Sequence, residues 1–123
     1  MPPLIDGAVS VSLRVAASEA EREAAIGEWL RLPHAAVAPG RRAILAEGAL
    51  FDRSGPAGVP LVGLGAGCPC CIGSVALRVT LARTLRTFRP NSVLLLLKSA
   101  EHLPRLRRLL EGGEMGVRFE LDA

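Results

Sequence analysis

At 123 residues, of which 50% are hydrophobic and 22% charged, the chain has the composition of one folded domain, 1–123, rather than of a disordered segment. Aromatic residues make up only 3%, so we expect an aliphatic core and no base-stacking platform for single-stranded nucleic acid. The net charge of +3 comes from fourteen Arg and one Lys against twelve acidic residues, and on this count alone no nucleic-acid partner is expected.

Targeting signals are not evident in the chain. The first twelve residues have neither a basic start nor a long apolar stretch, and the longest aliphatic run, 93–97, is far below the ~20 residues of a membrane span. The three cysteines, Cys68, Cys70 and Cys71, fall within four positions, which is a poor disulfide framework for a secreted protein. We therefore expect a cytoplasmic protein without a membrane segment.

The first half of the chain begins with a strand and a helix. Residues 8–15 alternate apolar with small or polar residues, which predicts a strand. Ser18 and Glu21 have capping-box spacing, and apolar residues recur at helical spacing through 19–32 until Pro33. Three further segments follow: a buried strand at 41–47, a loop at 48–58 and an apolar strand at 59–64.

The next segment, 74–88, has a helical pattern. Its apolar stripe consists of Val75, Val79, Ala82 and Leu85, and Leu77, Leu81 and Phe88 widen it. The polar side is expected to carry Arg78, Arg83 and Arg86, most simply as a solvated face, with a phosphate- or nucleic-acid-binding stripe as the alternative.

The last third predicts a strand, a helix and a strand. Residues 92–97 are all aliphatic after the first, as in a central parallel strand that is covered on both faces. Ser99 is expected to cap a helix over 100–110, followed by a final strand at 117–121. In that helix we expect Leu103, Leu106 and Leu110 to point inward and Arg105, Arg107 and Arg108 outward.

The order β-α-β-β-α-β-α-β predicts an α/β fold with three layers: a mostly parallel sheet of about five strands with helices on both faces.

The charges are uneven along the chain. Residues 1–60 hold six Arg and seven acidic residues, a net of −1, whereas residues 61–123 hold eight Arg and one Lys against five acidic residues, a net of +4.

The cysteine cluster carries the clearest chemistry. It follows a predicted strand and precedes a predicted helix, where ligands bind in doubly wound sheets and where the helix dipole favours thiolates. Three thiolates suit Zn²⁺ or a similar transition metal, and a tetrahedral ion needs one more ligand. The candidates are Glu47, at the end of a predicted strand, and His34 or His102.

Two other interpretations of the cluster stay open. Free cysteines often pack as small apolar side chains without a chemical task. Alternatively, Cys68 and Cys71 form a C-x-x-C pair at a strand-to-helix junction, which is typical of thiol–disulfide exchange, although Cys70 would be a competing thiol.

The segment 61–71, L-V-G-L-G-A-G-C-P-C-C, resembles the strand and G-C-x-C-C motif of CobW-type metallochaperone GTPases. Upstream, I-L-A-E at 44–47 is similar to the family strand that ends in N-E. Downstream, K-S-A-E-H-L-P-R-L stands where the family has an E-T-S-G-L-A-D-P-like stretch, and F-E-L-D-A resembles a strand ending in V-D-A. The resemblance runs in order along nearly the whole chain and implies a P-loop NTPase-like or Rossmann-like sheet that handles a transition metal.

The nucleotide-binding motifs of that family are replaced. The phosphate-loop position, 16–23, has no glycine and three carboxylates, with Arg22 at the lysine position and Glu23 at the hydroxyl position. Leu97, Ala100 and Ala46 replace the family's acidic residue, glycine and asparagine, and the guanine-reading N-K-x-D motif would fall beyond residue 123. We therefore expect no bound nucleotide and no GTPase activity.

The sequence thus predicts a nucleotide-free CobW-like domain that holds a metal ion on Cys68, Cys70 and Cys71, with Glu47 as the fourth ligand. The alternatives are a thiol–disulfide oxidoreductase and a non-catalytic pseudo-GTPase domain that docks on a protein partner. An open sheet edge is also compatible with a homodimer.

Overall fold

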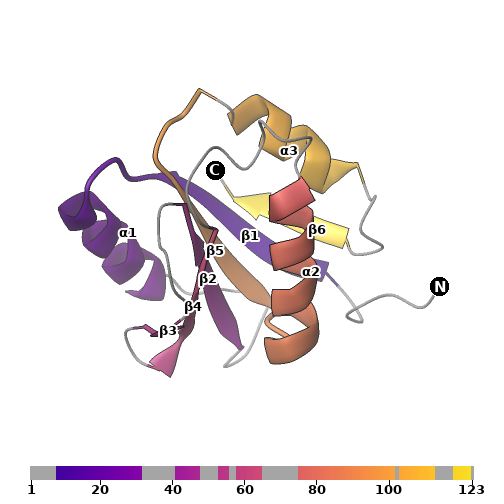
Figure 1. Ribbon diagram of the computed structural model, residues 1–123, viewed down its shortest axis with the longest axis horizontal. Coiled ribbons are helices and arrows are strands. Elements are labelled where there is room, and N and C mark those ends of the chain that lie inside the picture. The colour runs from indigo at the N-terminus through magenta and orange to yellow at the C-terminus, as the bar shows by residue number, and fades with distance from the viewer. Residues whose placement is uncertain are drawn as a thin grey trace.

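The computed structural model of the chain describes residues 8–31, 41–47, 53–55, 58–64, 75–101, 103–112 and 118–122. In these residues one sheet is covered by helices on both faces (Figure 1), which confirms the predicted α/β fold class. The strands are β1 (Ala8–Val15), β2 (Arg42–Ala46), β3 (Arg53–Ser54), β4 (Pro60–Gly63), β5 (Ser92–Leu97) and β6 (Arg118–Asp122). The helices are α1 (Glu19–Arg31), α2 (Val75–Phe88) and α3 (Leu103–Glu111).

The strands of the sheet follow the order β3-β4-β2-β5-β1-β6. β4, β2, β5, β1 and β6 run parallel, and β3 pairs antiparallel with β4 at the edge. β5 lies between β2 and β1, and its six residues, S-V-L-L-L-L, are all buried. The all-aliphatic run therefore forms the central parallel strand that the sequence predicts.

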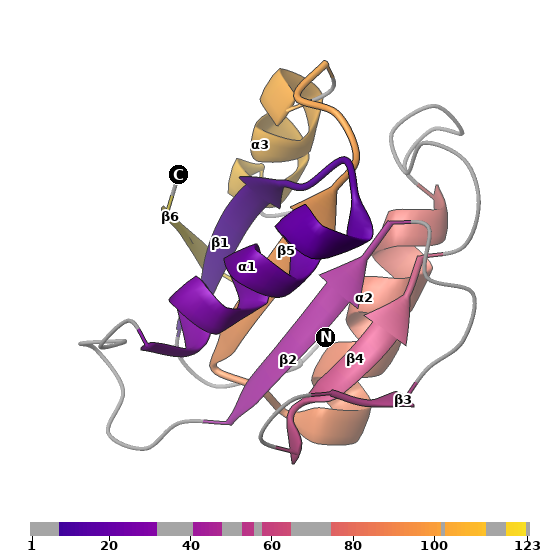
Figure 2. The same cartoon turned by 90° about the vertical axis from the view of Figure 1, so that its left-hand side faces the viewer.

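The connections between strands determine which helix covers which face. The chain moves in one direction along the sheet from β1 through α1 to β2, and in the opposite direction through α2 to β5 and through α3 to β6. Because parallel crossovers are right-handed, opposite directions place their helices on opposite faces. Figure 2 shows α1 in front of the sheet, and Figure 1 shows α2 and α3 together on the other side.

Each face has its own aliphatic core. Alternate side chains of β5 point to opposite faces, so Val93, Leu95 and Leu97 pack with α2 and α3, whereas Leu94 and Leu96 pack under α1. The core under α1 includes Trp29, which is 1% exposed. The Arg42 guanidinium lies 5.9 Å from the centre of its ring and Nη1 donates to the Leu30 carbonyl at 3.0 Å, which fixes the end of α1 to the start of β2.

One short strand lies within the segment that the sequence predicts as a loop, 48–58. β3 has only two residues, too few for an alternating pattern to be recognised. Directly after it, the Gly55 amide donates to the carbonyl of Val59, the residue before β4, at 2.7 Å. A Cβ atom at Gly55 would lie 2.8 Å from that same carbonyl oxygen, and Gly58 has a φ of 75°, so both positions favour glycine.

The face of α2 that packs on the sheet is not centred on the predicted stripe of Val75, Val79, Ala82 and Leu85. Leu77, Leu81 and Leu85 are buried, whereas Val79 is 62% exposed and Phe88 is 40% exposed. The sequence places apolar residues around much of this helix, so periodicity alone offers two stripes. Leu85 belongs to both stripes, and Leu77 and Leu81 bury more apolar area than Val79 and Ala82 would, which favours the observed orientation.

α3 begins at Leu103, three residues later than the predicted helix at 100–110. Pro104 explains the difference, because proline lacks an amide hydrogen and is tolerated only in the first turn of a helix. Ser99 does not cap this helix; its Oγ accepts a hydrogen bond from the Glu101 amide at 3.1 Å in the preceding turn. The inward leucines are as predicted: Leu106 and Leu110 are buried, and Leu103 packs against the core.

Candidate functional site

The carboxyl edge of the parallel strands is the candidate site. β1 and β5 are neighbours, and their connections leave this edge toward opposite faces, to α1 and α3 respectively. In open α/β sheets, ligands bind in the crevice at such a switch point. The residues that follow the strands here are Ala16 to Ser18 after β1, Glu47 after β2, Leu64 after β4 and Lys98 after β5.

Glu47 is fixed at this edge by two hydrogen bonds to the β5 side. Its amide donates to the Leu96 carbonyl at 2.9 Å, and its side-chain Oε1 accepts from the Lys98 amide at 3.1 Å. The residue as a whole is half-buried, and the hydrogen bond of its carboxylate to Lys98 lies at an exposed position. A carboxylate has two oxygens and about four acceptor positions, so this bond is compatible with ligation of a cation by the same group.

β4 leads from the other side of β2 toward the cysteine motif. Ala46 pairs with Gly63, and the Leu64 amide donates to the Ala46 carbonyl at 3.0 Å, one residue before Glu47. The chain therefore leaves the sheet beside Glu47, at Leu64, and enters α2 at Val75. Cys68, Cys70 and Cys71 belong to the ten residues between these two points and lie outside the described residues.

The two histidine candidates, His34 and His102, also lie outside the described residues. Within the described ranges, His, Cys, Asp and Glu side chains do not form a group of three that could hold a metal ion. Of the predicted ligands the structure thus describes Glu47, at the edge where the cysteine-bearing segment begins.

The start of α1 follows β1 at this same edge of the sheet. The Glu21 amide donates to Ser18 Oγ at 3.1 Å, and Glu21 Oε2 accepts from the Ala17 amide at 2.7 Å. This arrangement confirms the predicted capping box. Backbone amides that would face a phosphate in a glycine-rich loop bond instead to side chains of the helix, and exposed Glu19 and Glu23 add negative charge.

Two apolar residues at this edge are part of the core. Leu97 is 3% exposed, and its carbonyl accepts from the Ala16 amide at 2.7 Å. Ala46 is fully buried. At both positions this chain has an apolar side chain that contributes to packing and offers no ligand for Mg²⁺ or a nucleotide base.

The Lys98 amide is a functional contact that sequence reasoning missed. It binds the Glu47 carboxylate although the two residues are 51 positions apart. The pairing depends on β5 lying next to β2, and residue patterns indicate strands but not their neighbours. The available signal was that both residues follow directly after buried strands.

No family model, curated protein or solved structure matches this chain in the three comparisons made. Among the described helices, none is long and apolar enough to cross a membrane.

Proposed function

We propose that the chain binds a transition-metal ion, Zn²⁺ or a similar ion, through Cys68, Cys70 and Cys71 with Glu47 as the fourth ligand. Its role is to carry or sense the ion without nucleotide turnover. The observation that carries this proposal is the position of Glu47: its carboxylate is held at the carboxyl edge, directly beside the point where β4 leads into the cysteine motif.

The chemistry of the donor set fits such an ion. Three thiolates and one carboxylate complete a tetrahedral shell, and thiolates select soft or borderline metals over Mg²⁺ or Ca²⁺. α2 begins at Val75, four residues after Cys71, and the positive end of its dipole favours deprotonated thiols nearby. The Lys98 amide would orient the Glu47 carboxylate, as hydrogen bonds behind metal ligands commonly do.

The capping box at α1 supports the nucleotide-free part of the proposal. A phosphate at this helix would have to displace the Glu21 carboxylate from the Ala17 amide and approach Glu19 and Glu23. Both steps are unfavourable for an anion. A CobW-like domain with this helix start would keep the metal chemistry of its relatives without their phosphate site.

A cobalt titration of the reduced protein tests the metal proposal. Co²⁺ should produce the intense near-ultraviolet absorption of thiolate-to-metal charge transfer, and added Zn²⁺ should displace it. The triple variant C68S/C70S/C71S should lose this absorption, whereas a variant with an unrelated exposed carboxylate changed, E28Q, should keep it. Absence of the absorption in the parent protein, or its persistence in the triple variant, would overturn the proposal.

The same preparations separate the two alternatives. Turnover of a disulfide substrate such as insulin with a dithiol reductant, lost in C68S and C71S and accompanied by no metal binding, would instead identify thiol–disulfide exchange. Metal-free protein with unreactive thiols would identify an interaction domain.

A further inference from the structure

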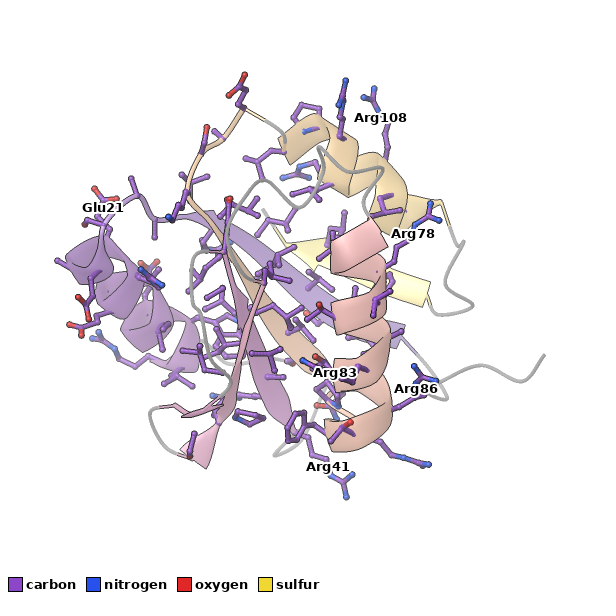
Figure 3. The ribbon with its side chains drawn as sticks, viewed as in Figure 1. Glu21, Arg41, Arg78, Arg83, Arg86 and Arg108 are labelled. Atoms are coloured by element: carbon purple, nitrogen blue, oxygen red, sulfur yellow. The ribbon has the colours of Figure 1, made fainter. Side chains whose placement is uncertain are left out.

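The side of the sheet covered by α2 and α3 has a surface rich in arginine. Six exposed arginines lie on these helices or directly after α2, and we call them the arginine face: Arg78, Arg83, Arg86, Arg89, Arg105 and Arg108. Figure 3 shows Arg78, Arg86 and Arg108 on this side of the sheet, with Glu21 on the opposite side. Both helices thus expose guanidinium groups on the side of the sheet opposite α1.

Acidic side chains are almost missing from the same two helices. α2 has none in its 14 residues, and α3 has only Glu111, its last residue. α1, on the opposite side of the sheet, has four Glu and two Arg. A helix alone is about 10 Å wide, so α1 lies beyond the ~10 Å Debye length at 0.1 M salt, and its carboxylates do little to cancel the positive field of the arginine face.

Arginine is the basic residue used almost throughout the chain, and on this face its chemistry suits phosphate as the partner group. Guanidinium is planar and weakly hydrated, and it binds phosphate oxygens through two parallel hydrogen bonds. Two neighbouring helices that both carry such groups provide an extended surface for a chain of phosphates. A single phosphate would require one pocket with converging arginines, whereas these arginines are distributed along two helices.

The scarcity of exposed apolar and aromatic side chains on the described part of this side indicates which class of polyanion it suits. Val79 and Phe88 are the large exposed hydrophobic residues that the described part of this side offers, which is little apolar area for the centre of a stable protein interface. Single-stranded nucleic acid requires several exposed aromatic rings for stacking, and Trp29 and Phe119 are buried. The backbone of a duplex requires neither feature.

We propose that the arginine face binds the phosphate backbone of double-stranded nucleic acid without reading its sequence. The residue count in the sequence does not predict this, because it does not show that the arginines of two separate helices share one side of the sheet. The proposal does not depend on the metal site, because it concerns the guanidinium groups of the arginine face. It can be tested with reduced, metal-free protein.

Fluorescence anisotropy with a fluorescein-labelled 24-base-pair DNA duplex, and with an RNA duplex of the same sequence, tests this proposal. Sequence-independent binding of this kind has dissociation constants of about 10⁻⁴ to 10⁻⁶ M at physiological salt, and it weakens steeply as salt is raised. Comparison of the two duplexes shows whether DNA or RNA is the preferred source of the phosphates. An unrelated duplex sequence should bind equally well.

The double variant R86A/R108A removes one guanidinium from each helix of the arginine face. Its affinity for the duplex should fall by about tenfold or more, and each lost contact should reduce the slope of log K against log salt by about 0.9. The matched control is R22A/R31A, which removes the same charge from α1. Arg31 is a close match for Arg86, because the Nε atom of each donates to the carbonyl four residues earlier, at 3.1 and 3.4 Å.

Three results would overturn the proposal. The first is no binding of either duplex at 50 mM salt. The second is an equal loss of affinity in R86A/R108A and in R22A/R31A, which would show that net charge and not this face is responsible. The third is displacement of the duplex by poly-L-glutamate at equal charge concentration, which would identify an acidic protein surface as the better partner. All four side chains lie at the surface or half-buried on helices, and circular dichroism verifies that each variant is folded.

Discussion

Glu47 has one observed contact and one proposed role, and a pair of substitutions separates them. Its Oε1 atom accepts the Lys98 amide at 3.1 Å, and the proposed metal site uses the same carboxylate. Glu47→Ala removes both functions, whereas Glu47→Gln keeps a side-chain oxygen for the amide and removes the charge that a metal requires. The two variants should therefore differ in stability and agree in metal affinity.

The size of the stability difference follows from the environment of this bond. A hydrogen bond contributes about 0.5–1.5 kcal/mol to stability, and more with a charged acceptor. Because Lys98 is exposed, water replaces the lost carboxylate, so Glu47→Ala should cost about 1 kcal/mol. For a domain of this length that corresponds to roughly 4 °C in Tm. Glu47→Gln should cost only a few tenths of a kcal/mol, roughly the loss of charge assistance.

Urea or thermal denaturation of metal-free protein measures the first effect, and Co²⁺ titration measures the second. Loss of the carboxylate should weaken Co²⁺ binding by about tenfold or more, since even loss of a partner behind a metal ligand costs 10–100-fold. Glu28→Gln, an exposed carboxylate on α1, is the charge-matched control and should change neither quantity. Equal destabilisation by the two Glu47 variants would refute the hydrogen-bond argument. Unchanged Co²⁺ affinity in both would refute the ligand assignment.

Three further predictions concern the packing of α2, the start of α1 and the contact between Arg42 and Trp29. Leu81→Ala should lower the free energy of unfolding by about 2–5 kcal/mol, because the Leu81 side chain is 2% exposed. Val79→Ala should change it by no more than about 0.5 kcal/mol, because Val79 lies at the surface. The reverse order in urea denaturation would mean that α2 packs on the sheet through the stripe that contains Val79. Ser18→Ala removes the acceptor of the Glu21 amide and should cost about 1 kcal/mol, measured by thermal denaturation, with Ser18→Asp restoring most of it. Arg42→Lys should cost about 0.5–1 kcal/mol through the weaker contact with Trp29, and no change in the unfolding midpoint would show that the ring contact contributes nothing.

Elements that are specified by local pattern could be predicted well from the sequence. β1 matches the predicted bounds 8–15, and β5 matches 92–97, because an alternating run and an all-aliphatic run each have few competing interpretations. The start of α1 was predictable for the same reason: Ser18 and Glu21 form a capping box that acts within one turn. In each case the interactions that decide the structure lie within a few residues of one another.

Features that depend on tertiary packing could not be predicted in the same way. For α2 the pattern allowed two stripes, and the sheet selects the one that contains Leu77 and Leu81. At the candidate site, the position of Glu47 after a strand was predictable, but its contact with Lys98 depends on β5 being inserted between β2 and β1. Strand order is fixed by the packing of whole elements, and single residue types carry little information about it.

The arginine face illustrates how topology converts a pattern along the chain into a pattern in space. Residues 1–60 have a net charge of −1 and residues 61–123 a net charge of +4. The chain reverses its direction along the sheet at the edge strand β3, close to the boundary between these halves. Because every crossover is right-handed, that reversal also changes the face on which helices are laid down. The acidic helix α1 therefore covers one face and the basic helices α2 and α3 cover the other, so a modest net charge becomes a strongly polarised molecule. A uniform distribution of the same fourteen arginines would give no surface that a duplex could distinguish from the rest of the protein.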